Sequence, residues 1–345
     1  MTPNRIVIRP PNWLGDAVLA LPAMAALRAH FPAAHVDIAA PPAIAALMRE
    51  RTDVRPDRVV ELPASDRAAI AALRGGGYDL GVLLPNSFRS AYQFWRAGVR
   101  ERWGYATSGR GLLLTRRGRL PNRRDAPHQM DYYVELVRGL DIACADPVPR
   151  LEVSGPSAAR AAALLEQLRV PMDGPMIGLA PGAAYGQAKQ WPPDRVAALI
   201  ARLVREHRAV CLILGATHDQ PASRAIESAL RVLAPDALAR TIDLVGRTSL
   251  GALTGVTARC DVLISNDSGA MHVAAALGRP VVAIFGPTNE RATRPIGAHD
   301  VITEPVFCRP CMLRDCPIDH RCMKRITVDR VFAAVAARLD ASHGH

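Results

Sequence analysis

The sequence contains no uninterrupted apolar run of the roughly 20 residues that a membrane-spanning helix requires. Its beginning, MTPNRIVIRPPNWLGD, also lacks the long apolar core of a secretory signal, because polar residues and prolines interrupt it at once. We therefore expect a cytoplasmic protein. The chain has 345 residues, 49% of them hydrophobic, which suits two packed α/β domains better than one.

Several motifs of common enzyme classes are also missing. Neither the phosphate-binding pattern GxxxxGK[ST] nor the dinucleotide pattern GxGxxG occurs, so hydride transfer from a dinucleotide is not supported. HExxH, GxSxG and paired metal-binding acids in a suitable context are absent as well. We therefore expect a mechanism that needs no metal.

Acidic residues are outnumbered, 32 against 43 basic ones, for a net charge of +11. The excess is uneven, since ten arginines and one acid, Glu101, lie between Arg89 and Arg124. Such a stretch would attract a polyanion, namely nucleic acid, a phosphorylated glycolipid or an anionic membrane surface. A solvated arginine-rich face would have the same composition, and both interpretations stay open.

Three of the seven cysteines, Cys144, Cys211 and Cys260, are isolated in the sequence. Cys211 and Cys260 lie in or beside apolar runs and are predicted to be core residues. Four others cluster in CRPCMLRDCPIDHRC, where the first pair has CxxC spacing and the number of thiols fits a structural zinc site; they are Cys308, Cys311, Cys316 and Cys322. The later spacings match no standard zinc ribbon, so a loop without metal is the alternative, and a catalytic metal is not expected.

Short buried strands alternate with amphipathic helices along the whole chain. This alternation predicts mostly parallel, doubly wound sheets. Predicted strands cover residues 5–9, 36–39, 59–62, 80–84, 176–180, 209–215, 243–245, 262–264 and 281–285. We expect an N-terminal domain over 1–168, a second domain over 169–326, and a C-terminal helix and tail over 327–345 that packs back toward the first domain.

Two predicted strand-to-helix turns carry a candidate charged group. In NWLGDAVLALP, Gly15 permits a tight backbone and Asp16 could act as a general base, although an aspartate there could equally cap the helix. In PGAAYGQAKQWP, Gly182 would let the backbone approach a phosphate and Lys189 could place a charge on it. The alternative for that segment is an ordinary exposed loop.

The stretch VLISNDSGAMHVAAALGRPVVAIFGPT predicts strand, helix and strand within 27 residues. Such a unit presents its turns at the carboxyl ends of the strands, where ligands bind. Asp267 can accept hydrogen bonds from sugar hydroxyls, while Ser268 and the backbone of Gly269 can donate to a phosphate at the helix N-terminus. His272 is either a packed core histidine or a group that supports a diphosphate.

Three segments together resemble the bacterial lipopolysaccharide heptosyltransferases: RPPNWLGDAVLALPAMAALRAHFP, PGAAYGQAKQWP and NDSGAMHVAAALGRPVVAIFGPT. PNSFRS and AGVRERWGY are more similar to the second type of these enzymes than to the first. The resemblance implies a GT-B fold, with two Rossmann-like domains facing a central cleft. It also implies an inverting transfer that needs no cofactor, with acceptor in the first domain and nucleotide-sugar in the second.

The resemblance also assigns roles to individual residues. Asp16 matches the proposed catalytic base and Lys189 the lysine that contacts the donor phosphates. The donor-binding residues that it implies are Gly182, Lys189, Thr248 (beside the adenine), Asp267, Ser268, Gly269, His272, Gly286, Pro287 and Thr288. The implied acceptor-binding residues are Asn12, Trp13, Gly15, Asn86 and Arg89. Some relatives have hydroxyl residues where this chain has Ala184 and Tyr185, so phosphate contacts there would come from the backbone.

The implied activity is transfer of L-glycero-D-manno-heptose from ADP-heptose to the first heptose of Kdo–lipid A, that is, to heptosyl-Kdo2-lipid A. The enzyme would contact the cytoplasmic face of the inner membrane peripherally. The alternatives are a first-type lipopolysaccharide heptosyltransferase, a sugar-nucleotide epimerase on the same fold, or a basic nucleic-acid-binding protein with a zinc loop. Because the basic stretch and the cysteine cluster lie in different halves, we expect no nucleic-acid partner.

Overall fold

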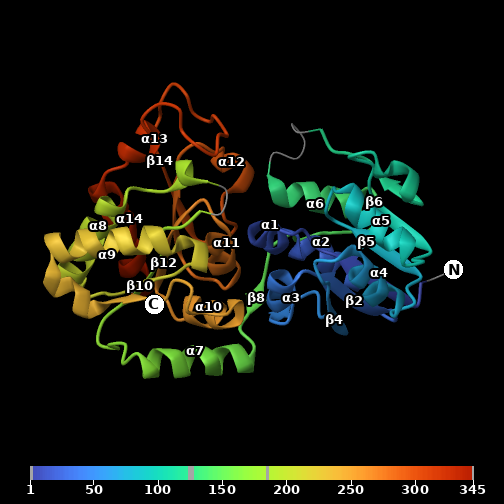
Figure 1. The fold of residues 1–345 in the computed structure, drawn as a ribbon, viewed down its shortest axis with the longest axis horizontal. Coiled ribbons are helices and arrows are strands. Elements are labelled where there is room, and N and C mark those ends of the chain that lie inside the picture. Colours follow the sequence, from blue (N-terminus) through green and yellow to red (C-terminus); the bar gives the residue numbers. More distant parts are fainter. Residues whose placement is uncertain (1–2, 123–127, 184–185, 344–345) are drawn as a thin grey trace. The chain divides into compact units, whose positions relative to one another are not determined.

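The computed structural model describes residues 3–122, 128–183 and 186–343. The chain forms two compact units, Met1–Ser154 and Gly155–His345 (Figure 1). The second unit begins earlier than the expected boundary after residue 168, because helix α7 (Gly155–Gln167) packs on α10 (Leu250–Thr257). A side chain at Gly255 would collide with Ala161 and the Ser157 backbone, so this contact is close.

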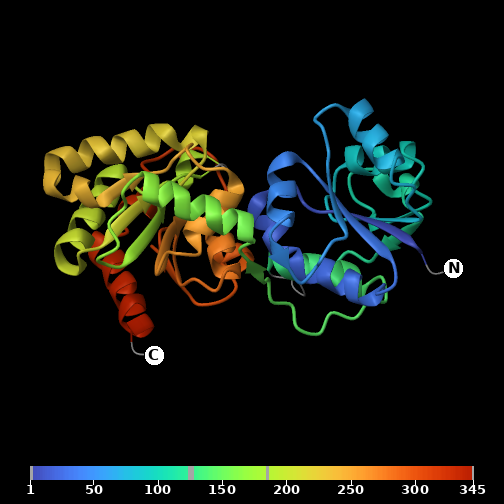
Figure 2. The same cartoon turned by 90° about the horizontal axis from the view of Figure 1, so that it is seen from below.

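The first unit has a six-stranded parallel sheet among its described residues, in the order β4-β2-β1-β5-β6-β7. Figure 2 shows the sheet between two helix layers, with α2 and α6 on one side and α4 and α5 on the other. The strands are β1 (Arg5–Arg9), β2 (His35–Ala40), β4 (Arg58–Glu61), β5 (Leu80–Leu83), β6 (Glu101–Tyr105) and β7 (Arg116–Gly118). The helices are α1 (Leu14–Leu19), α2 (Leu21–His30), α3 (Pro42–Met48), α4 (Asp66–Arg74), α5 (Phe88–Arg96), η1 (Arg110–Leu113) and α6 (Gln129–Arg138). A small antiparallel pair, β3 (Arg51–Thr52) and β8 (Leu151–Glu152), completes the unit.

The second unit repeats the same strand order, β11-β10-β9-β12-β13-β14, again parallel. Its strands are β9 (Met176–Ala180), β10 (Val210–Ile213), β11 (Thr241–Asp243), β12 (Val262–Asn266), β13 (Val281–Phe285) and β14 (His299–Thr303). Its remaining helices are η2 (Gln187–Lys189), α8 (Pro193–His207), η3 (Thr217–Asp219), α9 (Gln220–Leu233), η4 (Pro235–Arg240), α11 (Gly269–Ala276), α12 (Glu290–Thr293), α13 (Arg321–Lys324) and α14 (Val328–His343). The predicted doubly wound α/β class is thereby confirmed for both units.

The helices of the second unit cover both faces of its sheet. One core cluster joins α8, α9 and α14 to one face, and another joins α7, α10 and α11 to the other (Figure 1). The expected C-terminal segment 327–345 is therefore not a separate part, since Val331, Val335 and Leu339 of α14 belong to the core of the second unit. Cys211 and Cys260 are fully buried, as predicted, and burial raises the pKa of both thiols to about 12.

The predicted single helix over residues 17–30 is two helices, α1 and α2, joined at Ala20. Pro22 stands in the first turn of α2, where its missing N–H costs nothing, but it cannot continue a helix from α1. The sequence patterns did not predict several elements, among them α4, α5, β6, β7 and β14. Within the described ranges, none of the helices is both long and apolar enough to cross a membrane.

Candidate active site

Both units place their candidate residues at the same point of the fold. In each sheet the first strand lies beside the fourth, and the helices that follow these two strands cover opposite faces. A crevice opens at the carboxyl ends of such strands, which is where doubly wound sheets bind ligands. Asp16 follows β1 and Asn86 follows β5, while Lys189 follows β9 and Asp267 follows β12.

A buried ion pair joins the two turns of the second unit. Lys189 Nζ lies 2.6 Å from Asp267 Oδ2, and the two residues are only 9% and 7% exposed. Thr288 Oγ1 donates to the same carboxylate oxygen at 2.7 Å, so the turn after β13 joins the cluster. Lys189, Asp267 and Thr288 are therefore brought together as one polar cluster at the carboxyl edge.

Asn266, which the sequence analysis did not single out, fixes the position of this cluster. Its side chain donates to the Pro181 carbonyl at 2.5 Å and accepts from the Trp191 N–H at 3.3 Å. The last residue of β12 thus holds both ends of the loop that carries Lys189. The sequence shows that Asn266 precedes Asp267, but its hydrogen-bond partners follow only from the pairing of β12 with β9.

Helix α11 begins directly after the ion pair. Ser268 is its N-cap in extended conformation, and its hydroxyl contacts Ser265 Oγ at 3.1 Å without capping the helix. Gly269 is the first helical residue, so the positive end of the helix starts beside Asp267. His272 is 5% exposed within α11, which fits the packed-histidine interpretation.

The two turn glycines of the second unit are required by close packing. A side chain at Gly182 would collide with the Asp219 carboxylate, and one at Gly286 would collide with Met323. Pro287 accepts from the Met312 N–H at 2.9 Å, and Met312 belongs to the segment that contains the cysteine cluster. These residues hold the shape of the carboxyl edge.

The cysteine segment braces the turns that carry the ion pair. Arg309 donates to the carbonyls of Gly286 and Thr288, and the Arg314 carbonyl accepts from the Ala188 N–H at 3.0 Å. Within the described residues, no group of three or more potential ligands is arranged to hold a metal ion. The zinc expectation for Cys308, Cys311, Cys316 and Cys322 therefore has no structural support, whereas a bracing role for the segment does.

In the first unit, Asp16 is the third residue of α1, and Trp13 is the N-cap. The alternative interpretation of Asp16 as the capping residue is therefore wrong. Burial raises the pKa of Tyr133 well above its usual value, and the nearby Asp16 carboxylate adds to the effect. Gly15 lies inside α1 with an ordinary φ, so the expected tight turn does not depend on it. Trp13 is 58% exposed.

The turn after β5 contributes the other predicted acceptor residues. The Asn86 amide and the Tyr132 hydroxyl exchange hydrogen bonds of 2.8 and 3.0 Å. Arg89 donates to Asp66 Oδ1 at 2.6 Å and lowers the pKa of that carboxyl. The Asn86 and Arg89 side chains are both exposed at the carboxyl edge, and these hydrogen bonds hold them in position.

Two buried arginines at this edge were missed by the sequence analysis. Arg9 ends β1 with 7% exposure, and its Nη2 donates to Asn12 Oδ1 at 2.8 Å. Burial and the nearby Arg89 guanidinium lower the Arg9 pKa to about 10. Arg110 is fully buried and donates to the carbonyls of Pro85, which follows β5, and Tyr105, the last residue of β6. Neither arginine has a carboxylate partner among the described residues, and Arg9 Nε has no hydrogen-bond partner there either.

One predicted donor-binding residue, Thr248, is not part of these clusters. It lies in the turn after β11, at the same edge of the sheet, but β10 separates β11 from β9. Ala184 and Tyr185 lie outside the described residues, as do Arg123 and Arg124 of the basic stretch.

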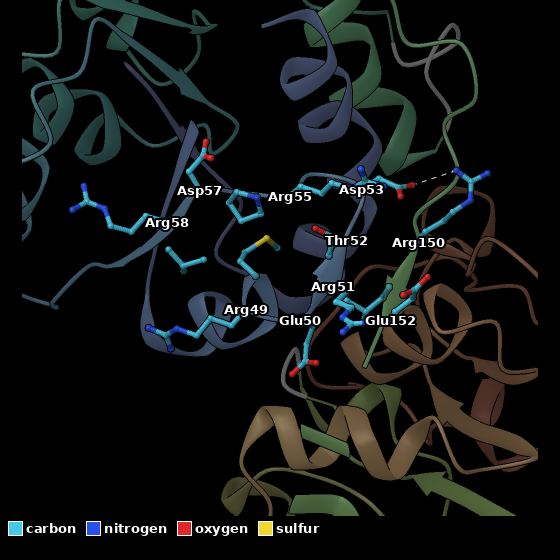
Figure 3. Close-up of a pocket in the computed structure, with 14 residues that line it drawn as sticks. Arg49, Glu50, Arg51, Thr52, Asp53, Arg55, Asp57, Arg58, Arg150 and Glu152 are labelled. Atoms are coloured by element: carbon cyan, nitrogen blue, oxygen red, sulfur yellow. Dashed lines mark hydrogen bonds and ion pairs between the residues drawn. The ribbon is translucent and has the colours of Figure 1, made fainter. Parts of the chain in front are cut away.

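A cavity of about 570 Å³ lies elsewhere in the first unit (Figure 3). It is lined by β3, the segment leading into β4 and residues near β8, and Arg150 reaches across to Asp53. It opens at the amino end of β4, opposite the carboxyl edge. Its position in the fold does not favour it as the ligand site.

The comparisons with known proteins agree with one another. A model of glycosyltransferase family 9 (heptosyltransferase) matches residues 67–321. The chain is 32% identical over 305 residues to lipooligosaccharide heptosyltransferase 2 of Haemophilus influenzae, covering 84% of this chain and 86% of that protein. It is 31% identical over 307 residues to lipopolysaccharide heptosyltransferase 2 of Escherichia coli, covering 85% of each. The solved structure of E. coli ADP-heptose LPS heptosyltransferase II is similar with a TM-score of 0.83 at 28% identity, over 98% of this chain and 99% of that one.

Proposed function

Because the chain belongs to glycosyltransferase family 9, the heptosyltransferases, we propose that it moves L-glycero-D-manno-heptose from ADP-heptose to the first heptose of Kdo–lipid A. It is a glycosyltransferase with the GT-B fold. The observation that carries the proposal is the buried Lys189–Asp267 pair at the carboxyl edge of the second unit. A fixed cation beside the start of α11 suits the diphosphate of a nucleotide-sugar.

The donor would bind at that edge with its diphosphate near Lys189 and the N-terminus of α11. Ser268 Oγ and the N–H of Gly269 would donate to its phosphate oxygens. Asp267 would accept from a heptose hydroxyl while it keeps Lys189 in position. Thr248 would line the adenine, which fits its place beyond β10 at the same edge.

The reaction would begin with an acceptor hydroxyl whose proton passes to Asp16. The hydroxyl oxygen forms a bond to the anomeric carbon of the donor as the bond from that carbon to the phosphate oxygen breaks. Attack from the face opposite the phosphate inverts the anomeric centre. Negative charge then builds on the departing ADP, where Lys189 and the positive end of α11 stabilise it. This arrangement needs no divalent cation.

The acceptor would bind at the carboxyl edge of the first unit, beside Asn12, Trp13, Asn86 and Arg89. Asn12 and Arg89 lie next to the buried Arg9, which gives this edge an excess of positive charge suited to the anionic inner core. Because the lipid of this acceptor is anchored in a bilayer, the enzyme would work at the cytoplasmic face of the inner membrane by peripheral contact.

One incubation tests the proposal against its alternatives. The protein is mixed with ADP-heptose and either Kdo–lipid A or heptosyl-Kdo–lipid A, in EDTA, and ADP release and product mass are measured. We expect transfer to the heptose-bearing acceptor alone. Transfer to the acceptor without heptose would identify a first-type enzyme. Consumption of donor without any acceptor would identify an epimerase or hydrolase, and loss of activity in EDTA would refute the metal-free mechanism.

Replacing Arg9 with methionine tests the acceptor edge. We expect the KM for acceptor to rise about 10- to 100-fold, since a hydrogen bond to a charged group is lost, while the KM for donor stays unchanged. Thermal stability should change little, because methionine removes a buried, desolvated guanidinium that has no carboxylate partner among the described residues.

Arg28→Met is the matched control for the Arg9 variant. Arg28 pairs with Asp57 near the amino end of β2, away from the carboxyl edge, so its loss should leave both KM values unchanged. An Arg9→Met protein that unfolds more easily but keeps its acceptor KM would show that Arg9 serves the fold alone.

A further inference from the structure

Helix α5 buries Ala91 and Phe94 in the core together with two polar side chains, and it leaves two other aromatic side chains exposed. Phe88 and Trp95 are 49% and 46% exposed, whereas Ser90 and Gln93 are buried. Gln93 and Ser90 satisfy their polar atoms locally, Gln93 by donating to Asp66 at 2.6 Å. Exposed apolar side chains that lie next to one another, unlike single ones, mark a surface that meets a partner.

The exposed rings form one continuous ridge. Phe88, Tyr92 and Trp95 follow the spacing that places residues on the same side of a helix. Phe88 and Tyr92 stack with their centroids 6.4 Å apart, and Tyr92 and Trp95 lie 6.0 Å apart. We call Phe88, Tyr92 and Trp95 the α5 face.

The charges around the α5 face are mostly positive. The Arg96 guanidinium lies 5.7 Å from the centre of the Trp95 ring, and α5 itself contains two arginines and no acid. The Arg100 side chain is 81% exposed, with Asp79 at 3.6 Å. Tryptophan and tyrosine favour the boundary between lipid tails and headgroups, and arginines beside them favour anionic headgroups.

We infer that the α5 face docks the enzyme onto an anionic phospholipid surface. The inference rests on the proposed function, because an acceptor with a lipid anchor must be reached at a bilayer. Helix α5 begins directly after the carboxyl end of β5, so Phe88 lies next to Asn86 and Arg89 of the acceptor edge. Docking through this face therefore brings the acceptor edge to the membrane surface, where the sugar core emerges from the headgroups.

Cosedimentation with vesicles tests the inference. The probes are phosphatidylcholine vesicles and vesicles with about one-third phosphatidylglycerol, which carry the negative charge of a bacterial leaflet. The wild type should sediment with the anionic vesicles. Phe88→Ser/Trp95→Ser should bind them at least about tenfold more weakly, because two apolar anchors are lost. Arg96→Gln/Arg100→Gln should bind the anionic vesicles roughly fivefold more weakly for each charge removed, and added salt should weaken vesicle binding by the wild type similarly.

The matched control is Val232→Ser/Leu233→Ser, which removes two apolar side chains of 88% and 57% exposure from the end of α9. It should bind vesicles as the wild type does. Equal binding by the Phe88→Ser/Trp95→Ser variant would overturn the inference. So would a wild-type dimer that this variant dissociates without any change in vesicle binding, since the face would then join two copies.

Activity separates this inference from the proposed function. With the acceptor in detergent micelles, Phe88→Ser/Trp95→Ser should transfer heptose at the wild-type rate. With the same acceptor in anionic vesicles its kcat/KM should fall about tenfold, in proportion to the lost binding. Absence of transfer by the wild type in both settings would refute the proposed function itself. Wild-type-like rates of the variant on vesicles would refute only the docking surface.

Discussion

Replacing Asp16 with asparagine should lower kcat for heptose transfer by about 10²- to 10⁴-fold and leave ADP binding unchanged. Asp16 stands in the first turn of α1, directly after the strand at the centre of the first sheet. Asparagine keeps the shape of the side chain but cannot take up the proton of the attacking hydroxyl. Single-turnover kinetics measure the chemical step, and calorimetric titration with ADP measures the donor site.

The control for this substitution is Asp194→Asn. Asp194 is likewise an acid in the first turn of a helix, α8 of the second unit. Both variants lose the same favourable interaction with a helix dipole, so their stabilities should fall by a similar small amount. Only Asp16→Asn should lose activity. If it retains more than about a tenth of the wild-type kcat, the base is another residue.

The donor side of the site could be predicted because its signal is local. A buried apolar strand followed by NDSG and a helix fixes Asp267 at the carboxyl edge of a parallel sheet, whatever the rest of the chain does. That Lys189 would be its partner could not be read from spacing, since 78 positions separate them. The pair depends on β9 and β12 being neighbours, which is a property of strand order.

The acceptor side was predicted less completely for two physical reasons. Arg9 ends a short apolar strand, and nothing in RIVIR distinguishes a buried arginine from one that reaches solvent. Only the packing around β1 shows that it is buried beside Arg89. Helix α5 was not predicted because Ser90 and Gln93 are buried beside Ala91 and Phe94 while Phe88 and Trp95 are exposed, which interrupts the usual apolar stripe. The same exposed rings identify the outer face of the helix.

The second large effect is expected at the Lys189–Asp267 pair, and a double-mutant cycle separates its structural part from its functional part. Lys189→Met should lower kcat by about 10²- to 10³-fold, because the cation that stabilises the departing diphosphate is lost. Asp267→Asn should weaken donor binding and slow transfer, because Lys189 is no longer held. Each single variant should also lose about 3 kcal/mol of unfolding free energy, since it leaves one buried charge without its partner.

The double variant Lys189→Met/Asp267→Asn removes both charges and should regain most of the lost stability. If the ion pair serves only the fold, the double variant should regain activity as well. If the pair binds the donor, activity should stay low, because neither the phosphate contact nor the sugar contact returns. We therefore expect urea unfolding of the double variant to approach that of the wild type while kcat/KM for ADP-heptose stays as low as in the worse single variant. If stability and kcat/KM recover together, Lys189 and Asp267 serve only the fold, and the backbone of α11 alone binds the diphosphate.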